Sequence, residues 1–417
     1  MVSTAQSNPG EAREQRELDE LTDRLAPLIL AAADELESRR RMPDSLVDAL
    51  WEAGVFSAFT PAEVGGRETD LIEWLEQIEQ LSRLNGSVGW NAFVQAGQTT
   101  LPPDAMRRIL AEGRYIVASS FGRAAGRAYR VDGGYRVAGR WPFASGSPYA
   151  THFMGRSLVY DTDEKPVPNP QLGGQAQVFA VFPREDVTLH DTWDGLGLRG
   201  SASMDFEVRD AFVPEDFAGP TLTGPYSAPL FRGIYFLLLG HSAHALGIAR
   251  CAIDSFVEIV QRAQANTPHG STRQRRLGND QVHKLAIAKA ESLVQAARAF
   301  TLDAASRAWQ QAQRDEEVSY HLRVLMAQSM ILSAHSAKEA VGLLFEQAGT
   351  SAVIRGTTLE RCYRDIATAA QHTLVVETRY ETIGEYYLTR SLPGGPQIDL
   401  SMTAMVGPPP PARPITD

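Results

Sequence analysis

The distribution of proline constrains the fold of this chain more than any other feature. The chain has 24 prolines in 417 residues, yet none occurs from His269 to Leu392. Because proline breaks the interior of a helix, so long a proline-free stretch is typical of long helices. Apolar residues recur there at helical spacing, at Leu285, Ala288, Leu293, Ala296 and Phe300. The stretch is therefore predicted to form a helix bundle.

The middle of the chain, from Tyr115 to Pro225, has the pattern of β-strands. Short alternating or apolar runs are bounded by glycine-rich turns at 132–134 and 195–200. The runs are Tyr135 to Val137, Val178 to Phe182 and Phe206 to Val208. We expect a compact β domain in this part of the chain.

The N-terminal part, up to Arg114, returns to helical spacing. One predicted stripe consists of Leu18, Leu21, Leu25, Leu28, Ala32 and Leu36, and a second of Leu46, Leu50 and Val55. Pro27 lies inside the first stripe and predicts a kink or a helix start. The α+β organisation expected is an N-terminal helical domain (11–114), a central β domain (115–225), a C-terminal helix bundle (226–392) and an extended tail (393–417) that contains Pro408 to Pro411.

Composition excludes several classes of function. With 43% hydrophobic and 22% charged residues the chain should be globular, and a formal net charge of −10 argues against nucleic acid as a partner. Cys251 and Cys362 lie far apart in the sequence and form no zinc-binding spacing. No signal peptide or run of 18 apolar residues is evident, so we expect a cytoplasmic protein that does not span a membrane.

The segment WPFASGSPYA, from Trp141 to Ala150, is the first candidate site. Its aromatic side chains next to a Ser-Gly turn would offer an apolar wall, a hydroxyl and backbone N–H groups to a flat, partly polar heterocycle such as a flavin. The alternative is a strand end with a core tryptophan and an ordinary turn.

The glycine-rich segment from Thr192 to Asp216 is the second candidate. A strand pattern follows it rather than a helix, so it does not match the dinucleotide-binding fingerprint. Either it is a wide turn with Arg199 in solvent, or it is a loop whose Ser201 and Ser203 present hydrogen-bond donors to a ligand.

The third candidate segment runs from Glu360 to Thr373. Arg364 and Asp365 are adjacent and do not face one another along a helix, so each should pair elsewhere. His372 follows in a mostly small, apolar stretch, where a histidine is often a buried core residue. The chain's other histidines fall into no ligand pattern, and no metal site is predicted.

Several of these segments together resemble the acyl-CoA dehydrogenase superfamily. The resemblance rests on PAEVGG (61–66), WPFASG (141–146), GLGLRGSASMDFEVRDAFVPE (195–215), FEQAGTSAV (345–353) and YRD (363–365). It implies an N-terminal helical domain, a central β domain and a C-terminal four-helix bundle through which subunits form a homotetramer. It also implies a flavin bound between the β domain and the bundle.

One departure from the family pattern indicates a branch. Many dehydrogenases of this family carry their catalytic glutamate at the position of Thr373, and a threonine hydroxyl is too weak a base to replace it. His372 is similar instead to the histidine of the flavin-dependent monooxygenases, such as the oxygenase components of two-component hydroxylases and dibenzothiophene monooxygenase. The resemblance implies reduced FMN or FAD from a separate flavin reductase, O2 as co-substrate, a C4a-hydroperoxyflavin and a small aromatic or heteroaromatic substrate.

The resemblance also assigns roles to residues. His372 would be the catalytic base, since an imidazole accepts a proton near neutral pH, and Ser145 would hold the flavin N5 proton. The other flavin-lining positions implied are Trp141, Gly146, Trp193, Arg199, Ser201, Gly349, Thr350 and Ser351. Substrate would meet His372 together with Trp90, Asn91 and Phe121, for which simple helix packing is the alternative.

Two other functions compete with the monooxygenase. An acyl-CoA dehydrogenase could take its base from another helix, with Glu381 and Glu385 as the candidates. A non-catalytic protein on the same fold would bind no flavin in either redox state.

Overall fold

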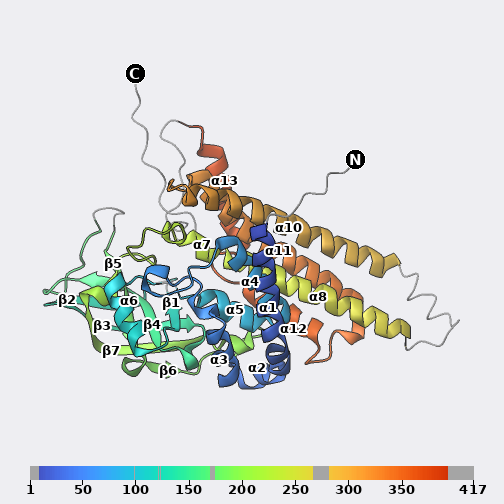
Figure 1. Ribbon diagram of the computed structural model, residues 1–417, viewed down its shortest axis with the longest axis horizontal. Helices are drawn as coiled ribbons and strands as arrows, with labels where there is room; N and C mark the ends of the chain where they lie inside the picture. Colours follow the sequence, from blue (N-terminus) through green and yellow to red (C-terminus); the bar gives the residue numbers. More distant parts are fainter. Residues whose placement is uncertain are drawn as a thin grey trace.

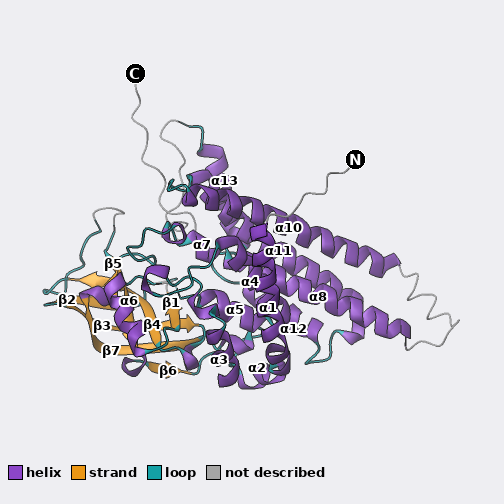
Figure 2. Cartoon of the chain, viewed as in Figure 1, coloured by secondary structure: helices purple, strands orange, loops and turns teal. Residues whose placement is uncertain are grey.

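The computed structural model describes residues 9–97, 99–120, 122, 124–169, 174–265 and 281–392. N-terminal helices lie between a β-sheet at one end of the molecule and long helices that extend to the other end (Figure 1). Figure 2 shows the strands gathered at that one end, with helices in the rest of the described chain. The predicted order of helices, β domain and helix bundle is confirmed.

Among the N-terminal helices, α5 is buried along almost its whole length and packs against α4, and from the bundle it contacts α8 (Gly240–Ala265) and α12 (Thr358–Ala369). Asp70 caps α4 and Asn85 caps α5, each with a side-chain oxygen that accepts backbone N–H groups of the first turn. The helices are α1 (Pro9–Ala31), α2 (Ala33–Arg39), α3 (Asp44–Glu52), α4 (Leu71–Leu84), α5 (Gly86–Val94) and α6 (Pro103–Glu112).

The first predicted stripe needs two corrections. Leu28 is 46% exposed, and the buried positions are Leu25, Ile29, Ala32 and Leu36. These positions follow the helical period, whereas the predicted stripe placed Leu28 one residue before the buried Ile29. Of the two outcomes predicted at Pro27, the helix start is excluded, because Pro27 lies inside α1 (Pro9–Ala31).

The β domain is one mixed eight-stranded sheet with the order β6-β7-β3-β2-β4-β5-β8, in which β1 pairs with β4 in parallel. The three predicted strands are confirmed as parts of β3, β5 and β7. The strands are β1 (Val117–Ser120), β2 (Gly126–Val131), β3 (Gly134–Ala144), β4 (His152–Tyr160), β5 (Gln177–Pro183), β6 (Thr188–His190), β7 (Met204–Pro214) and β8 (Ala218–Gly219).

The described part of the proline-free stretch, residues 281–392, is mostly helical, as predicted. Figure 1 shows α8, α10 and α11 side by side, and contacts between α10 and α11 and between α8 and α11 confirm this packing. The bundle helices are α7 (Tyr235–Leu238), α8 (Gly240–Ala265), α10 (Gln281–Gln313), α11 (Tyr320–Ala348), α12 (Thr358–Ala369) and α13 (Tyr380–Thr389).

The face of α10 that packs in the bundle is not the predicted one. Small residues, among them Ala286, Ala290 and Ala297, are buried, whereas Leu285 is 56% exposed. Alanines let helices approach closely, so the buried face of α10 consists mostly of small residues, with Val294 and Trp309 as the larger buried ones. Of the predicted positions, Leu293 and Phe300 are half-buried. The predicted apolar pattern therefore lies on a second face of α10, beside the face that is buried in the bundle.

One stretch, Tyr235–Ala263, is long and apolar enough to cross a membrane by length and composition, but 89% of its most apolar window is buried inside the protein. Such burial is typical of a core helix, so this stretch is weak evidence for a membrane span.

The helices α8 and α12 bring together the thiols of Cys251 and Cys362, which the sequence separates widely. Both cysteines are free.

Candidate functional site

Three serines and a tryptophan form a continuous hydrogen-bond chain where the N-terminal helices meet the β domain. The indole Nε1 of Trp90, on α5, donates to Ser145 Oγ at 2.9 Å. Ser145 Oγ lies 2.7 Å from Ser203 Oγ, which lies 2.8 Å from Ser201 Oγ. Ser145 directly follows β3 and Ser203 directly precedes β7, and pairing of these strands at Ala144 and Met204 brings the hydroxyls together.

The turn at Gly146 fixes the position of Ser145. Gly146 has φ 74°, which favours glycine, and its N–H donates to the Ser201 carbonyl at 2.8 Å. A Cβ at this position would lie 2.2 Å from Oε1 of the buried Gln95 side chain. Neither polar atom of the Gln95 amide has a hydrogen-bond partner among the described residues, so the turn adjoins unused hydrogen-bonding capacity.

The glycine-rich loop is held against α12 by its backbone. Leu198 N–H donates to Asp365 Oδ1 at 2.6 Å, and Gly197 N–H donates to Thr368 Oγ1 at 2.9 Å. Burial raises the pKa of Asp365 to about 6, opposed by the hydrogen bond from Leu198. Arg364 instead pairs with Glu360 and Glu37, so the two adjacent charges do pair elsewhere, as expected.

His372 lies in an aromatic cluster with Trp90. Its ring centroid is 5.8 Å from that of Trp90 and 4.3 Å from that of His241, on α8. His244 lies one turn further along α8, and its ring centroid is 5.2 Å from that of Trp90 in an edge-to-face arrangement. The structure thus brings His372, Trp90 and Ser145 together from three separate segments of the chain.

The histidines of this cluster are neutral near pH 7. Burial lowers the pKa of His372 and of His244 to about 4, and that of His241 well below its usual value. Leu374 N–H lies 3.4 Å from His372 Nδ1, a long contact that favours the tautomer with the proton on Nε2. A neutral His372 can donate a hydrogen bond or accept a proton.

Sequence reasoning did not single out His241 and His244 as site residues. Their spacing of three residues on a predicted helix places them on one face and could have drawn attention to the pair. Nothing in the sequence indicated that His372 would contact the same face, because that contact joins α8 to a turn more than a hundred residues later.

Trp141 is a correction to the predicted site. It is fully buried in the core of the β domain, stacks on Phe206 with centroids 4.9 Å apart, and donates through Nε1 to the Arg156 carbonyl. Because side chains alternate along a strand, Trp141 faces the core. The alternative of a core tryptophan at a strand end is the correct one.

Phe143, two residues later, provides the apolar surface that Trp141 was expected to provide. It is 67% exposed, has φ 61°, and meets the edge of Trp193 at a centroid distance of 6.3 Å. A positive φ at a phenylalanine is strained, and strain of this kind concentrates at functional sites. The sequence could not show this, because the strain arises where the register of β3 and β7 shifts between Trp141 and Ala144.

Arg199 does not extend into solvent or toward Ser145. Its guanidinium donates to the Glu37 carbonyl, to Asp194 Oδ1 and to the Gly195 carbonyl. These bonds tie the glycine-rich loop to α2, so Arg199 supports the loop, whereas its side chain was expected to line the flavin. Asn91 is completely buried and donates to the Gly200 carbonyl at 3.3 Å, which makes it a second support.

The remaining predicted positions lie apart from Ser145 or outside the described residues. Gly349, Thr350 and Ser351 are exposed at the end of α11, and none of the described contacts joins them to Ser145. Phe121 lies outside the described residues. Glu381 is exposed on α13, and Glu385 lies on the same helix, away from the Trp90 cluster.

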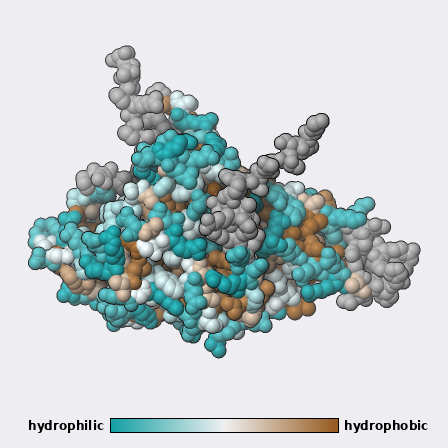
Figure 3. Space-filling model, in the orientation of Figure 1, coloured by the Kyte–Doolittle hydropathy of each residue, from teal (hydrophilic) through white to brown (hydrophobic). Residues whose placement is uncertain are grey.

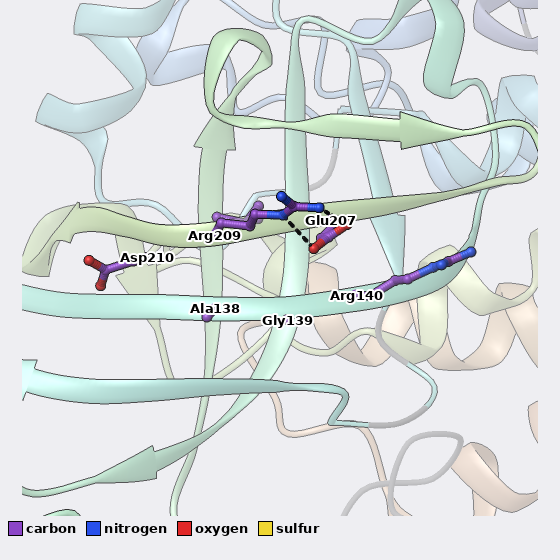
Figure 4. A pocket seen from close by; sticks show the side chains of 7 residues that line it. Ala138, Gly139, Arg140, Glu207, Arg209 and Asp210 are labelled. Carbon is purple, nitrogen blue, oxygen red and sulfur yellow. Dashed lines mark hydrogen bonds and ion pairs between the residues drawn. The ribbon is translucent and has the colours of Figure 1, made fainter.

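Among the described residues no group of His, Cys, Asp and Glu could hold a metal ion. A surface pocket lined by Arg140, Glu207, Arg209 and Asp210 lies on the outer side of β3 and β7 (Figure 4). Its charges are paired, with Arg209 on Glu207, Arg140 on Asp205 and Asp210 on Arg136. It therefore offers no unpaired charge to a ligand, and the Trp90 cluster remains the candidate site.

The residues around Ser145 fit a flavin. A flavin ring needs a flat apolar surface and polar partners at its edge, which the exposed Phe143 with Trp193 and the Ser145 hydroxyl with the Gly146 turn provide. The unpartnered Gln95 amide next to Gly146 adds polar atoms of the kind that the edge of a heterocycle requires.

Comparison with known proteins gives two family matches. Residues 12–103 match the acyl-CoA dehydrogenase N-terminal domain, and residues 239–377 match the acyl-CoA dehydrogenase C-terminal domain.

Similar proteins of known name cover most of the chain. The indole-3-acetate monooxygenase of Pseudomonas putida is 27% identical, over 87% of this chain and 92% of that protein. The flavin-dependent monooxygenase, oxygenase subunit HsaA, of Rhodococcus jostii is also 27% identical, over 84% of this chain and 92% of its own. The crystal structure of the 3-HSA hydroxylase from Rhodococcus sp. RHA1 superposes with a TM-score of 0.83 at 26% identity, covering 92% of this chain and 99% of that one.

Proposed function

Because this chain belongs to the acyl-CoA dehydrogenase superfamily and is an oxidoreductase of its flavin-dependent monooxygenase branch, we propose that it is the oxygenase component of a two-component system. It would receive reduced FMN or FAD from a separate reductase and, through a C4a-hydroperoxyflavin, transfer one oxygen atom of O2 to a small aromatic or heteroaromatic substrate. When bound, the flavin supplies the activation of O2, and the protein supplies binding, orientation and the exclusion of water.

The observation that carries this proposal is the connection from Ser145 through Trp90 to His372. Trp90 donates to Ser145, at the proposed flavin edge, and contacts the ring of His372 with its own ring. A flavin held at Ser145 and a substrate held at His372 would therefore both lie next to the same buried indole. His372 is neutral, so it can orient a substrate hydroxyl or N–H group by a hydrogen bond. It can also accept the proton of that group, as a weaker base than a free imidazole because burial lowers its pKa.

The acyl-CoA dehydrogenase alternative receives less support. Its candidate base Glu381 is exposed, and Glu385 lies on the same helix, away from the Trp90 cluster. The residue at the usual position of the base is Thr373, which is exposed. Anaerobic mixing with an acyl-CoA separates the two functions, since only a dehydrogenase would reduce bound oxidised flavin.

The proposal is tested by supplying chemically reduced FMN or FAD, without reductase, to the protein in oxygenated buffer with a panel of phenols and indoles. We expect an oxygenated product from at least one of these compounds. Release of all reducing equivalents as H2O2, at the rate of free flavin and with every compound, would contradict the proposal.

Ser145→Ala tests the proposed flavin contact. Removing the hydroxyl should raise the fraction of reduced flavin that is lost as H2O2, because the N5 position loses its hydrogen-bond partner. The cost to folding should be about 1–3 kcal/mol, because the buried indole N–H of Trp90 loses its acceptor. H2O2 and product are measured per flavin, with urea unfolding on the same samples, and unchanged coupling would remove Ser145 from the site.

A homotetramer formed through the bundle is the second expectation. Apolar side chains are exposed on the outside of α8 and α10, including Val257, Val282 and Leu285. Figure 3 shows hydrophobic patches over the helical part of the molecule within a mostly hydrophilic surface. Light scattering at micromolar concentration should give the mass of a tetramer, and Leu285→Glu should lower it. A wild-type monomer would contradict the proposal.

A further inference from the structure

The hydroxyl chain beyond Ser145 has only two complete arrangements of its protons. A serine hydroxyl has one proton and two lone pairs, whereas an indole N–H can only donate. Ser145 Oγ must therefore accept from Trp90, which leaves it one lone pair and its proton. Ser203 lies between Ser145 and Ser201 and has a single proton for its two contacts.

The first arrangement makes Ser145 an acceptor. In this arrangement Ser203 donates to Ser201 and Ser145 donates to Ser203, so one lone pair of Ser145 remains for a ligand. The second makes Ser145 a donor. In this arrangement Ser201 donates to Ser203 and Ser203 donates to Ser145. Both lone pairs of Ser145 are then used, and its proton remains for a ligand.

The two arrangements match the two redox states of a flavin. N5 of a reduced flavin has a hydrogen and donates, whereas N5 of an oxidised flavin has a lone pair and accepts. We propose that Ser203 sets whether Ser145 donates or accepts the hydrogen bond to the flavin, and so biases this site toward reduced flavin. Ser203 itself need not contact the flavin ring. This inference rests on the proposed flavin contact of Ser145.

The physical reason is the cost of a buried proton without an acceptor. Ser203 is 5% exposed and Ser201 is completely buried, so the protons of these serine hydroxyls have little access to water. With Ser203 present, the Ser145 proton has an acceptor and the lone pair of Ser145 is free for N5–H. Without Ser203, accepting from N5–H would leave the Ser145 proton without an acceptor. Donating to an oxidised N5 would leave only one lone pair unused, on an oxygen that already accepts from Trp90. The unpaired proton costs more free energy than the unused lone pair.

Ser203→Ala should therefore change the preference of the site between redox states. Oxidised and reduced flavin, FMN and FAD each, are titrated anaerobically into wild type and variant by fluorescence. We expect the ratio of the oxidised to the reduced Kd to fall roughly tenfold, which corresponds to one hydrogen bond. A role limited to packing would weaken the binding of both redox states alike and leave the ratio unchanged.

Ser201→Ala provides an independent test with the same sign. Without Ser201, the Ser203 proton has Ser145 as its remaining partner in the chain, which again makes Ser145 a donor. The ratio should fall in this variant also, so the inference stays testable if Ser203→Ala fails to fold. The matched control is Ser333→Ala, which removes a buried hydroxyl paired with Thr301 at 3.0 Å on the bundle helices and should leave the ratio at its wild-type value.

The outcomes separate this inference from the proposed function. An unchanged ratio in both serine variants, with altered flavin affinity in Ser145→Ala, would overturn the role of Ser203 and leave the flavin site in place. Unchanged affinity for both redox states in Ser145→Ala would overturn the flavin contact itself, and the inference with it. A fall of the ratio in Ser333→Ala equal to that in Ser203→Ala would also overturn the inference.

Discussion

His372→Ala should lower product formed per reduced flavin by roughly 100-fold, the usual contribution of a positioned acid–base group. Flavin binding should persist, because Ser145 and the glycine-rich loop are intact. His372→Asn should recover part of the yield if orientation dominates, since an amide can still hydrogen-bond but cannot take the proton. The measurement is product per flavin in a single turnover. His321→Ala, which removes a histidine bonded to Tyr386 outside the cluster, is the matched control.

The pH dependence of stability tests whether the imidazole of His372 is buried in the folded protein. Its pKa in the folded protein is about 4, below its ordinary value near 6.5, so between these values the unfolded chain binds a proton that the folded chain does not. The free energy of unfolding therefore rises with pH across this range, by up to about 3 kcal/mol for this group. Urea unfolding at pH 5 and pH 7 should show a smaller rise in His372→Asn. Full product yield from His372→Ala would end the catalytic assignment whatever the stability result.

Gly197→Ala should have the largest effect of any substitution in the glycine-rich loop. A Cβ at this position would lie 2.1 Å from the Arg364 carbonyl oxygen, and backbone atoms of α12 cannot move aside as a flexible side chain can. The loop must then leave α12 and lose the hydrogen bonds from Gly197 and Leu198. We expect a loss of about 3 kcal/mol in the free energy of unfolding, and weaker flavin binding.

Gly342→Ala is the matched control for this steric argument. A Cβ there, on α11, would meet no described residue within 4 Å, so alanine should stabilise the helix by up to about 1 kcal/mol. Denaturant unfolding of both variants and flavin titration are the measurements. Wild-type stability and flavin affinity in Gly197→Ala would show that the loop does not need its contact with α12.

The sequence was sufficient for the order of the elements and for the segments that form the site. Strand and helix patterns depend on local spacing, so β3, β5, β7 and the proline-free helices could be predicted from it. Ser145 and His372 could be selected because motifs in the chain resemble a family. The pattern was less reliable for which face of a helix is buried, since α10 has apolar residues on two faces and packs through its alanines.

The tertiary structure decided which side chains of each segment serve the site. Trp141 and Phe143 lie in the same motif, and only the strand register turns the first into the core and leaves the second exposed. Arg199 was expected to line a ligand, and contacts with α2 give it a supporting position. His241 and His372 meet through the packing of distant segments. The sequence by itself determined local conformation and the chemistry available, because both depend on neighbouring residues; the positions of hydroxyls and imidazoles relative to one another depend on long-range packing, which only the folded chain defines.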